Sequence, residues 1–402
     1  MAKPKIRFKG FTDDWEQRKL IDYLVVSSEK NRDNRFTKDD VLSVSGEYGI
    51  VNQIEFQGRS FAGASVSNYG VVENGDVVYT KSPLKSNPYG IIKTNKGIPG
   101  IVSTLYAVYK PKEITDSKFV QIYFELDSRM NSYMHPLVNK GAKNDMKVSA
   151  ENALKGMVSF PKKDEQEMIS LYFSTLDHFI TLHQRKCEET KKLKKYMLQK
   201  MFPQNGQTVP EIRFSGFTDA WEQRKFSDLY APLVERNSDL LPYNKTLSVA
   251  TMTYKTDGNG AADSSLANYK RLRTGDIAFE GQTSKSFRYG RFVLNDVGDG
   301  IMSPRFSALR PLTQMPTNFW KYYIHYEPIM RKVLVASTKA GTMMNELVID
   351  EFLKSPVLVP SIEEQTCIGG ILNNIDNLIT LHQHKCEQLQ SMKKFMLQNM
   401  FV

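Results

Sequence analysis

Two short segments contain polar side chains of types that bind other molecules. They read TKSPLKSNPYG over residues 80–90 and EGQTSKSFRYG over residues 280–290. Each follows a stretch typical of a strand, and lysine, serine and tyrosine are residue types that bind phosphates and base edges. A second pair of segments, residues 139–147 and 338–346, again combines lysine and glycine with polar side chains. The alternative is that all four are ordinary solvated loops. The candidate nucleic-acid contacts are Lys81, Lys85, Ser86, Asn87, Tyr89, Lys140, Lys143, Asn144, Lys285, Ser286, Arg288, Tyr289, Lys339, Thr342 and Asn345.

Catalytic motifs in the chain are incomplete. The tetrapeptide SNPY at residues 86–89 is close to the Asn-Pro-Pro-Tyr motif of amino methyltransferases, but it lacks one proline, and residues 286–289 read SFRY. The segment FAGAS at residues 61–65 lacks the second glycine of a cofactor loop. No GxxxxGK[ST] phosphate loop occurs in the sequence. We therefore expect neither catalytic nor cofactor-binding residues here.

A histidine and a cysteine one helical turn apart occur twice, as His183 with Cys187 and as His382 with Cys386. Four such side chains could hold a tetrahedral zinc ion if two helices brought them together. The alternative is a polar layer that fixes the register of a helix seam. We favour the polar layer because no further cysteine pair supports a metal, and we assign no metal ligand.

The chain contains a long internal duplication. Residues 6–19 read IRFKGFTDDWEQRK and residues 212–225 read IRFSGFTDAWEQRK, so they differ at only two of fourteen positions. Residues 176–202 return in similar form as residues 375–401, whereas the sequences between the matching parts are much less alike. A period of about two hundred residues is far longer than a solenoid repeat. The pattern predicts a duplicated domain, each copy with an attached helix.

Each copy ends in a predicted long helix. No glycine or proline interrupts residues 163–201, and the less polar positions there follow alternating steps of four and three, as in a heptad seam. Such a helix would be about 50 to 55 Å long at ~1.5 Å per residue, so it needs a partner, for which the other copy is the nearest candidate. The short connection after residue 203 favours antiparallel pairing. The seam positions are Ile169, Phe173, Leu176, Ile180, His183, Cys187, Thr190, Lys194, Met197 and Met201, then Ile368, Leu372, Ile375, Ile379, His382, Cys386, Leu389, Lys393, Met396 and Met400.

Between the matching parts, the sequence indicates globular units with strands and short helices. Residues 71–80 and 271–280 each read as a Gly-Asp turn followed by a strand. The aromatic spacing over residues 119–124 is typical of a core helix. Trp15 and Trp221 stand in the identical start segments, which favours an anchoring role for each in its unit.

Composition limits the function classes. The 402 residues are enough for two or three domains, and the three cysteines cannot form a disulfide framework. No signal peptide and no apolar run long enough for a membrane span are visible, which predicts a cytoplasmic protein without a membrane partner. A net charge of +10 and a pI of about 9.2 favour a polyanionic partner.

The order of these elements resembles a known family. A Trp-Glu-Gln-Arg-Lys start is followed by an Asn-Tyr pair at 68–69 and 268–269 and by a Gly-Asp turn. A proline and then Glu-Gln, at 165–166 and 364–365, open each long helix. This arrangement resembles the DNA specificity subunit (S subunit) of type I restriction-modification systems, and the resemblance covers essentially the whole chain. The family often has Pro-Pro-Leu before Glu-Gln, which this chain lacks.

The resemblance implies an α+β fold. Two strand-rich α/β target recognition domains would be separated by a long antiparallel two-helix coiled coil with pseudo-two-fold symmetry. The expected boundaries are 1–160 for the first recognition domain, 161–203 for its spacer helix, 204–359 for the second recognition domain and 360–402 for the second helix.

It also implies a division of labour between subunits. Each recognition domain would read one half of a bipartite site in double-stranded DNA, and the helices would set the spacer and dock two methyltransferase subunits. Restriction subunits, which act as translocase and nuclease, would join them. S-adenosylmethionine, ATP and magnesium would be carried by those partners. Two alternatives stay open, a DNA-binding regulator without enzymatic partners and a fused nuclease or methyltransferase.

Overall fold

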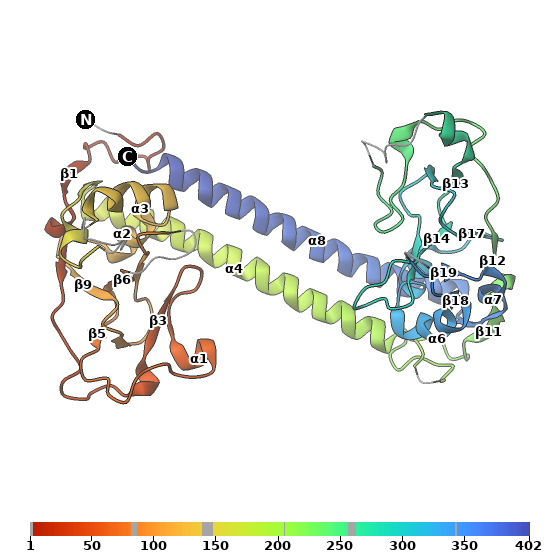
Figure 1. The fold of residues 1–402 in the computed structure, drawn as a ribbon, viewed down its shortest axis with the longest axis horizontal. Helices are drawn as coiled ribbons and strands as arrows, with labels where there is room; N and C mark the ends of the chain where they lie inside the picture. The colour runs from red at the N-terminus through yellow and green to blue at the C-terminus, as the bar shows by residue number, and fades with distance from the viewer. Residues whose placement is uncertain (1–2, 82–86, 139–147, 205, 256–262, 342–343) are drawn as a thin grey trace. The chain divides into compact units, whose positions relative to one another are not determined.

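The chain folds into helices and antiparallel strands grouped in two compact units. The first unit comprises residues Met1–His183 with His384–Val402, and the second comprises Gln184–Gln383. No helix in the described part of the chain is long and apolar enough to cross a membrane. The computed structural model (Figure 1) describes residues 3–81, 87–138, 148–204, 206–255, 263–341 and 344–402.

The first unit is built on a four-stranded antiparallel sheet with the strand order β2-β9-β6-β7. Its described residues also form two separate antiparallel pairs, β3-β4 and β5-β8, and the short helices α1, α2 and α3. Its core strands are short runs of buried apolar residues, as expected for strands covered on both faces. The elements are β2 (Leu24–Val26), β3 (Leu42–Ser45), β4 (Gly49–Asn52), α1 (Gln53–Gln57), β5 (Gly70–Val72), β6 (Val77–Tyr79), β7 (Ile92–Thr94), β8 (Gly100–Val102), β9 (Ala107–Pro111), α2 (Ser117–Tyr123) and α3 (Asp127–Met134).

The second unit repeats this plan, with a four-stranded sheet in the order β12-β17-β14-β15 and a pair β13-β16. It adds a short hairpin, β18-β19, immediately after helix α6. The elements are β12 (Tyr230–Pro232), β13 (Lys270–Leu272), β14 (Ile277–Glu280), β15 (Arg291–Leu294), β16 (Gly300–Met302), β17 (Ala308–Pro311), α5 (Thr317–Tyr323), α6 (Glu327–Ser337), β18 (Thr338–Lys339), β19 (Glu346–Leu347) and α7 (Ile349–Lys354).

The predicted Gly-Asp turns are present in both units. Gly75 has φ 89° and Gly275 has φ 95°, a left-handed conformation that favours glycine. The carboxylate of Asp76 accepts a hydrogen bond from the backbone N–H of Glu73 at 2.9 Å, and Asp276 closes its own turn in the same way at 2.7 Å. The turns join β5 to β6 and β13 to β14, so the prediction of a turn followed by a strand is confirmed.

Each unit contains a globular insert, which is the part of the chain between its start segment and its long helix. A pair of strands closes the base of each insert. In the first unit β1 (Glu16–Lys19) pairs antiparallel with β10 (Met157–Phe160). In the second unit β11 (Glu222–Lys225) pairs antiparallel with β20 (Pro356–Val359). We call the start segments and the long helices, which repeat between the two units, the frame. Each insert therefore begins and ends at one strand pair, immediately before the long helix of its unit.

The two tryptophans of the start segments lie in the cores, as predicted. Trp15 packs edge-on against Phe119 and Phe401, with ring centroids 6.1 Å apart in both contacts. Trp221 is 3% exposed and packs edge-on against Phe319 at 6.0 Å. The aromatic residues of α2 and α5 thus form the core-facing helices that their spacing predicts.

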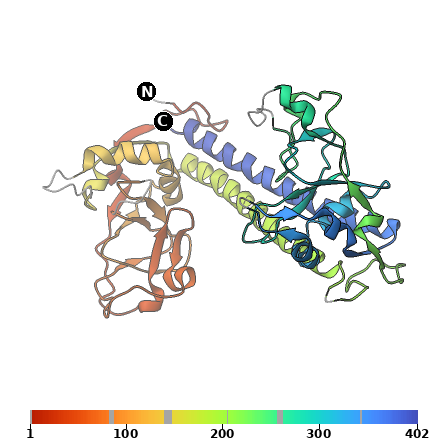
Figure 2. The ribbon, with the colours of Figure 1, turned by 45° about the vertical axis from the view of Figure 1, so that its right-hand side comes forward.

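The N-terminal and C-terminal segments meet in the first unit. The backbone N–H of Ile6 donates to the carbonyl oxygen of Asn399 at 3.0 Å. The equivalent bond in the second unit joins Ile212 to Lys200 at 2.9 Å, where the chain is continuous. Figure 2 shows the marks for the two chain ends side by side, next to the end of α8. The start segment of the first unit therefore contacts the last turn of α8.

Each copy of the duplication ends in a long helix, as predicted. The two helices are α4 (Lys163–Lys200) and α8 (Ile362–Asn399), each of 38 residues. The predicted seam positions are buried or half-buried along both helices. In the first unit the ammonium of Lys393 lies 2.7 Å from the carboxylate of Asp177, and in the second unit Lys194 lies 2.7 Å from Asp376. In the first unit Cys386 also contacts Ile180, so a later residue of α8 meets an earlier residue of α4, as in an antiparallel pair.

Candidate nucleic-acid interface

Lys81 is the first candidate residue of the first unit and lies two residues after the end of β6. Its backbone has φ 52°, and its ammonium donates to the carbonyl oxygen of Thr104 at 3.0 Å. Partial burial lowers the pKa of this lysine. The bond fastens the start of the 80–90 loop to the turn between β8 and β9.

Asn87 and Tyr89 face the body of the first unit. Asn87 is 7% exposed, and its side-chain amide donates to the carboxylate of Asp127 at 3.0 Å. The carbonyl oxygen of Tyr89 accepts from the hydroxyl of Tyr79 at 2.6 Å, and the ring of Tyr89 packs against the core. In this structure both residues hold the end of the loop against the sheet, and DNA contact by either stays a prediction. Six other candidates lie outside the described residues, namely Lys85, Ser86, Lys140, Lys143, Asn144 and Thr342.

The matching loop of the second unit presents its polar side chains to solvent. Lys285, Ser286 and Arg288 are exposed, and Tyr289 is half-buried. The guanidinium of Arg288 lies 5.9 Å from the ring centroid of Tyr289. A tight turn closes the tip, because the N–H of Ser284 donates to a carbonyl oxygen three residues on at 3.1 Å. The loop therefore offers two cations and a hydroxyl on one turn.

Asn345 joins the second candidate segment of this unit to the first. Its side-chain amide donates to the carbonyl oxygen of Arg288 at 3.1 Å, and its backbone N–H donates to that of Gly281 at 2.9 Å. A Cβ atom at Gly281 would lie 1.9 Å from the carbonyl oxygen of Asn345, so only glycine allows this approach. Lys339, on β18, lies 3.4 Å from the carboxylate of Glu346. The structure thus brings together two loops that the sequence places about fifty residues apart.

A third segment borders the same place and was missed by sequence reasoning. Arg305, in the turn between β16 and β17, lines a hollow of about 400 Å³ together with Gly281, Asn345 and Glu346. The turn lies there because β17 pairs with β14, whose C-terminal end begins the candidate loop. The sequence signal was an arginine in a hairpin turn, but its neighbours follow only from the strand order.

Charged groups elsewhere in the second unit are paired with one another. The carboxylate of Glu235 accepts from Arg273 at 2.8 Å and also from Arg310, and these bonds lower the pKa of Glu235 to about 2. Arg310 also donates to the carboxylate of Asp276 at 2.8 Å. Lys110 replaces the arginine in the first unit, 3.7 Å from the equivalent aspartate. Neighbouring carboxylates already compensate the charges of Arg273, Arg310 and Lys110, so these cations stabilise their own sheets.

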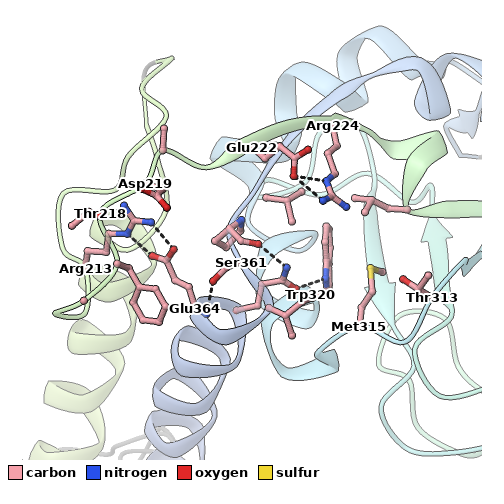
Figure 3. A pocket seen from close by; sticks show the side chains of 18 residues that line it. Arg213, Thr218, Asp219, Glu222, Arg224, Thr313, Met315, Trp320, Ser361 and Glu364 are labelled. Atoms are coloured by element: carbon pink, nitrogen blue, oxygen red, sulfur yellow. Dashed lines mark hydrogen bonds and ion pairs between the residues drawn. The ribbon is translucent and has the colours of Figure 1, made fainter.

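At the start of α8, both side chains of the repeated Glu-Gln pair form hydrogen bonds to other segments of the unit. Arg213 donates to both carboxylate oxygens of Glu364 at 2.7 Å (Figure 3). The side chain of Gln365 donates to the carbonyl oxygen of Pro360 at 3.0 Å and accepts from the indole N–H of Trp320 at 3.0 Å. A cavity of about 380 Å³ opens beside these residues. These bonds tie the start segment to the helix through Arg213 and Glu364, and the insert to the helix through Trp320 and Gln365.

The first unit has the same arrangement at the start of α4. Arg7 donates to both carboxylate oxygens of Glu165 at 2.7 Å. Gln166 donates to the carbonyl oxygen of Pro161 at 2.8 Å and accepts from the backbone N–H of Asp116 at 2.9 Å. Glu165 and Gln166 are 2% and 0% exposed, so the motif stabilises the helix N-terminus against the rest of the unit.

The histidine and cysteine pairs lie on the seam side of their helices. Cys187 and Cys386 are buried, and the thiol of Cys386 lies 3.7 Å from the carbonyl oxygen of Ile180. His183 and His382 are half-buried. Within the described ranges, no three histidine, cysteine, aspartate or glutamate side chains gather as metal ligands would.

Comparison with solved structures identifies the fold. No protein-family profile matches the chain. The type I restriction-modification S subunit from M. genitalium has 12% sequence identity and a TM-score of 0.59, and the match covers 100% of this chain and 99% of that one. The HsdS subunit from Thermoanaerobacter tengcongensis has 14% identity and a TM-score of 0.46, covering 96% of both chains. A chain from a type I restriction-modification assembly has 13% identity and a TM-score of 0.46, covering 96% and 97%. The first match spans both units and both long helices, and the chain therefore has the fold of the type I restriction-modification S subunit.

Proposed function

We propose that this chain is the DNA specificity subunit of a cytoplasmic type I restriction-modification complex. The observation that carries the proposal is the contrast between frame and insert. The frame repeats nearly unchanged, down to the bidentate pairs Arg7–Glu165 and Arg213–Glu364, whereas the inserts differ. Two similar attachments with two different reading surfaces are what a subunit needs when it connects identical partners to two different half-sites.

Each unit would read one half of a bipartite site in double-stranded DNA. The candidate loops follow the same strand of the same sheet in both units, after β6 in the first and after β14 in the second. Exposed cations such as Lys285 and Arg288 suit phosphate oxygens and guanine edges. The net charge of +10 favours association with a polyanion. The long helices would hold the two reading surfaces at a fixed spacing and so set the spacer length.

The outer faces of the long helices would dock two methyltransferase subunits. Both helices expose apolar side chains outside their seam, and such an uncovered stripe indicates a further partner. The two stripes correspond along the sequence, because each exposed apolar residue named below on α4 has an apolar counterpart 199 positions later in α8. Two equivalent stripes favour two copies of one partner. The exposed residues are Phe179, Leu193 and Tyr196 on α4, and Leu378, Met392 and Phe395 on α8.

This subunit would supply neither methyl transfer nor cleavage. The methyltransferase subunits would bring S-adenosylmethionine, and the restriction subunits would bring ATP and magnesium. The chain's own residues would bind the two half-sites and hold the partners at a fixed distance from them.

Reconstitution tests this proposal. The full chain and a candidate methyltransferase subunit are purified separately and mixed, and methyl transfer to DNA is measured. We expect transfer only from the mixture, at two adenines of one bipartite sequence. Methyl transfer by the chain alone would show a fused enzyme, and tight sequence-specific binding with no effect of the methyltransferase would show a stand-alone regulator. Either result contradicts the proposal.

A further inference from the structure

The two inserts share one hairpin turn whose tip differs. Between the Gly-Asp turn and the second core helix, a residue of the first unit corresponds to the residue 200 positions later in the second. Within this span the turn from β8 to β9 corresponds to the turn from β16 to β17. The N–H of Tyr106 donates to the carbonyl oxygen of Ser103 at 2.9 Å, and the N–H of Phe306 donates to that of Ser303 at 3.2 Å. The backbone of the turn is therefore built in the same way in both units.

Strand pairing places this turn beside the candidate loop in each unit. In the first sheet Tyr79 at the end of β6 pairs with Ala107 at the start of β9. Lys81 then reaches across to the carbonyl oxygen of Thr104 within the turn, at 3.0 Å. In the second sheet the N–H of Phe279 donates to the carbonyl oxygen of Ser307 at 2.8 Å. The turn therefore lies beside the start of the candidate loop in each unit.

The side chain at the tip is exposed in both units but differs in chemistry. Leu105 is 62% exposed, so packing in the unit gives no reason for an apolar residue there. Arg305 is exposed and borders the hollow of about 400 Å³ that also involves Asn345. The same backbone position thus presents a methyl-bearing side chain in one unit and a guanidinium in the other.

We propose that positions 105 and 305 determine base preference in the two half-sites. Leu105 packs against the methyl group of a thymine, and Arg305 donates to the O6 and N7 acceptors of a guanine in the major groove. This inference rests on the proposed function and goes beyond it, because it assigns one residue of each unit and the chemical class of base that each reads.

The test uses the full chain together with its methyltransferase subunits and a pool of DNA duplexes with random sequence. Bound duplexes are selected and sequenced for the wild type and for the variants Leu105→Arg, Arg305→Leu and Arg305→Lys. Ile98→Arg is the matched control, because Ile98 is 67% exposed in the turn at the opposite end of the same sheet. Thermal unfolding checks that each variant folds like the wild type.

We expect Leu105→Arg to weaken the preference at one thymine of the first half-site by about tenfold or more, with the second half-site and the spacer unchanged. Arg305→Leu should weaken the preference at one guanine of the second half-site by a similar factor. Arg305→Lys should retain part of that preference, and Ile98→Arg should leave both half-sites as in the wild type.

Two outcomes overturn the inference while the proposed function stands. One is a wild-type bipartite site that neither Leu105→Arg nor Arg305→Leu alters. The other is a uniform loss of affinity over all sequences in Arg305→Leu with a shallower salt dependence, which indicates a phosphate contact. A wild-type complex that selects no bipartite sequence contradicts the proposed function itself.

Discussion

Arg7 and Glu165 are joined by two hydrogen bonds of 2.7 Å, although 158 residues separate them in the chain. The pair ties the N-terminal segment to the first turn of α4, where Glu165 is 2% exposed. Arg213 and Glu364 repeat it in the second unit. The strong sequence match between the duplicated start segments therefore has a structural cause, because each segment must fasten a helix to a globular insert.

Replacing Glu165 by alanine should loosen this junction. The change leaves the guanidinium of Arg7 in a largely buried position without its carboxylate, and breaking a buried pair costs about 3 to 5 kcal/mol. Hydrogen exchange followed by mass spectrometry should show faster amide exchange in residues 5–10 and 161–170. Segments 211–216 and 360–369 of the same molecule serve as the control and should exchange as in the wild type. Unchanged protection at residues 161–170 would mean that the pair does not hold the helix start.

The two ion pairs between the long helices should differ in strength. Lys393 contacts the carboxylates of both Glu125 and Asp177, at 2.6 and 2.7 Å, and its side chain is 16% exposed. Lys194 contacts Asp376, which also accepts from the hydroxyl of Tyr322 at 2.7 Å. Lys393→Met leaves two carboxylates without their cation, so we expect a loss of about 2 to 3 kcal/mol in the free energy of unfolding.

Lys194→Met is the matched control, and it should lose only about 1 kcal/mol because Asp376 keeps a hydroxyl donor. Urea unfolding of the two variants under one set of conditions checks the order. An equal loss in both variants would contradict the account of the extra carboxylate.

Exposed cations of the second unit should contribute to DNA affinity in a salt-dependent way. Lys285→Ala and Arg288→Ala each remove a charge from an exposed side chain, so folding should be unaffected. If each contacts a phosphate, the slope of log affinity against log salt should fall by about one for each variant. Titration of duplex DNA at several salt concentrations measures this. Lys354→Ala, at an exposed lysine on α7, is the control and should leave the slope unchanged.

Acid should weaken the second unit partly through Glu235. Arg273 and Arg310 lower its pKa to about 2 in the folded state, whereas an unfolded glutamate titrates near 4.5. A depressed folded pKa stabilises the fold above about pH 4.5, and this contribution is lost as the pH falls toward 2. Thermal unfolding of Glu235→Gln should therefore show a lower midpoint than the wild type at pH 7 and a smaller difference at pH 3. A difference that stays constant from pH 7 to pH 3 would contradict this assignment.

The sequence predicted the helices and the frame because their signals are local or repeated. The heptad pattern predicted both α4 and α8, and the Gly-Asp turns followed from the conformational demand on Gly75 and Gly275. The buried position of Trp15 followed from its place in a repeated segment.

The reading surface could be predicted only in part, because it depends on strand order. Nothing in the local sequence places Asn345 against Arg288, or the turn carrying Arg305 beside the same loop. Asn87 was selected for its residue type, yet its amide is bonded to Asp127 and buried. Burial of a polar side chain in a loop depends on distant partners that a single sequence does not reveal.

The central claim is that the two inserts read separate half-sites on a common frame. Because β1 pairs with β10 at the base of the first insert, residues 20–156 can be exchanged for those of a relative while both strands and both helices are kept. Methylated adenines are then mapped genome-wide in cells that produce the methyltransferase subunits with the original or the exchanged chain. We predict that one half of the methylated sequence changes, whereas the other half and the spacer length stay the same. A change in both halves, or methylation that does not depend on the chain, would contradict the account.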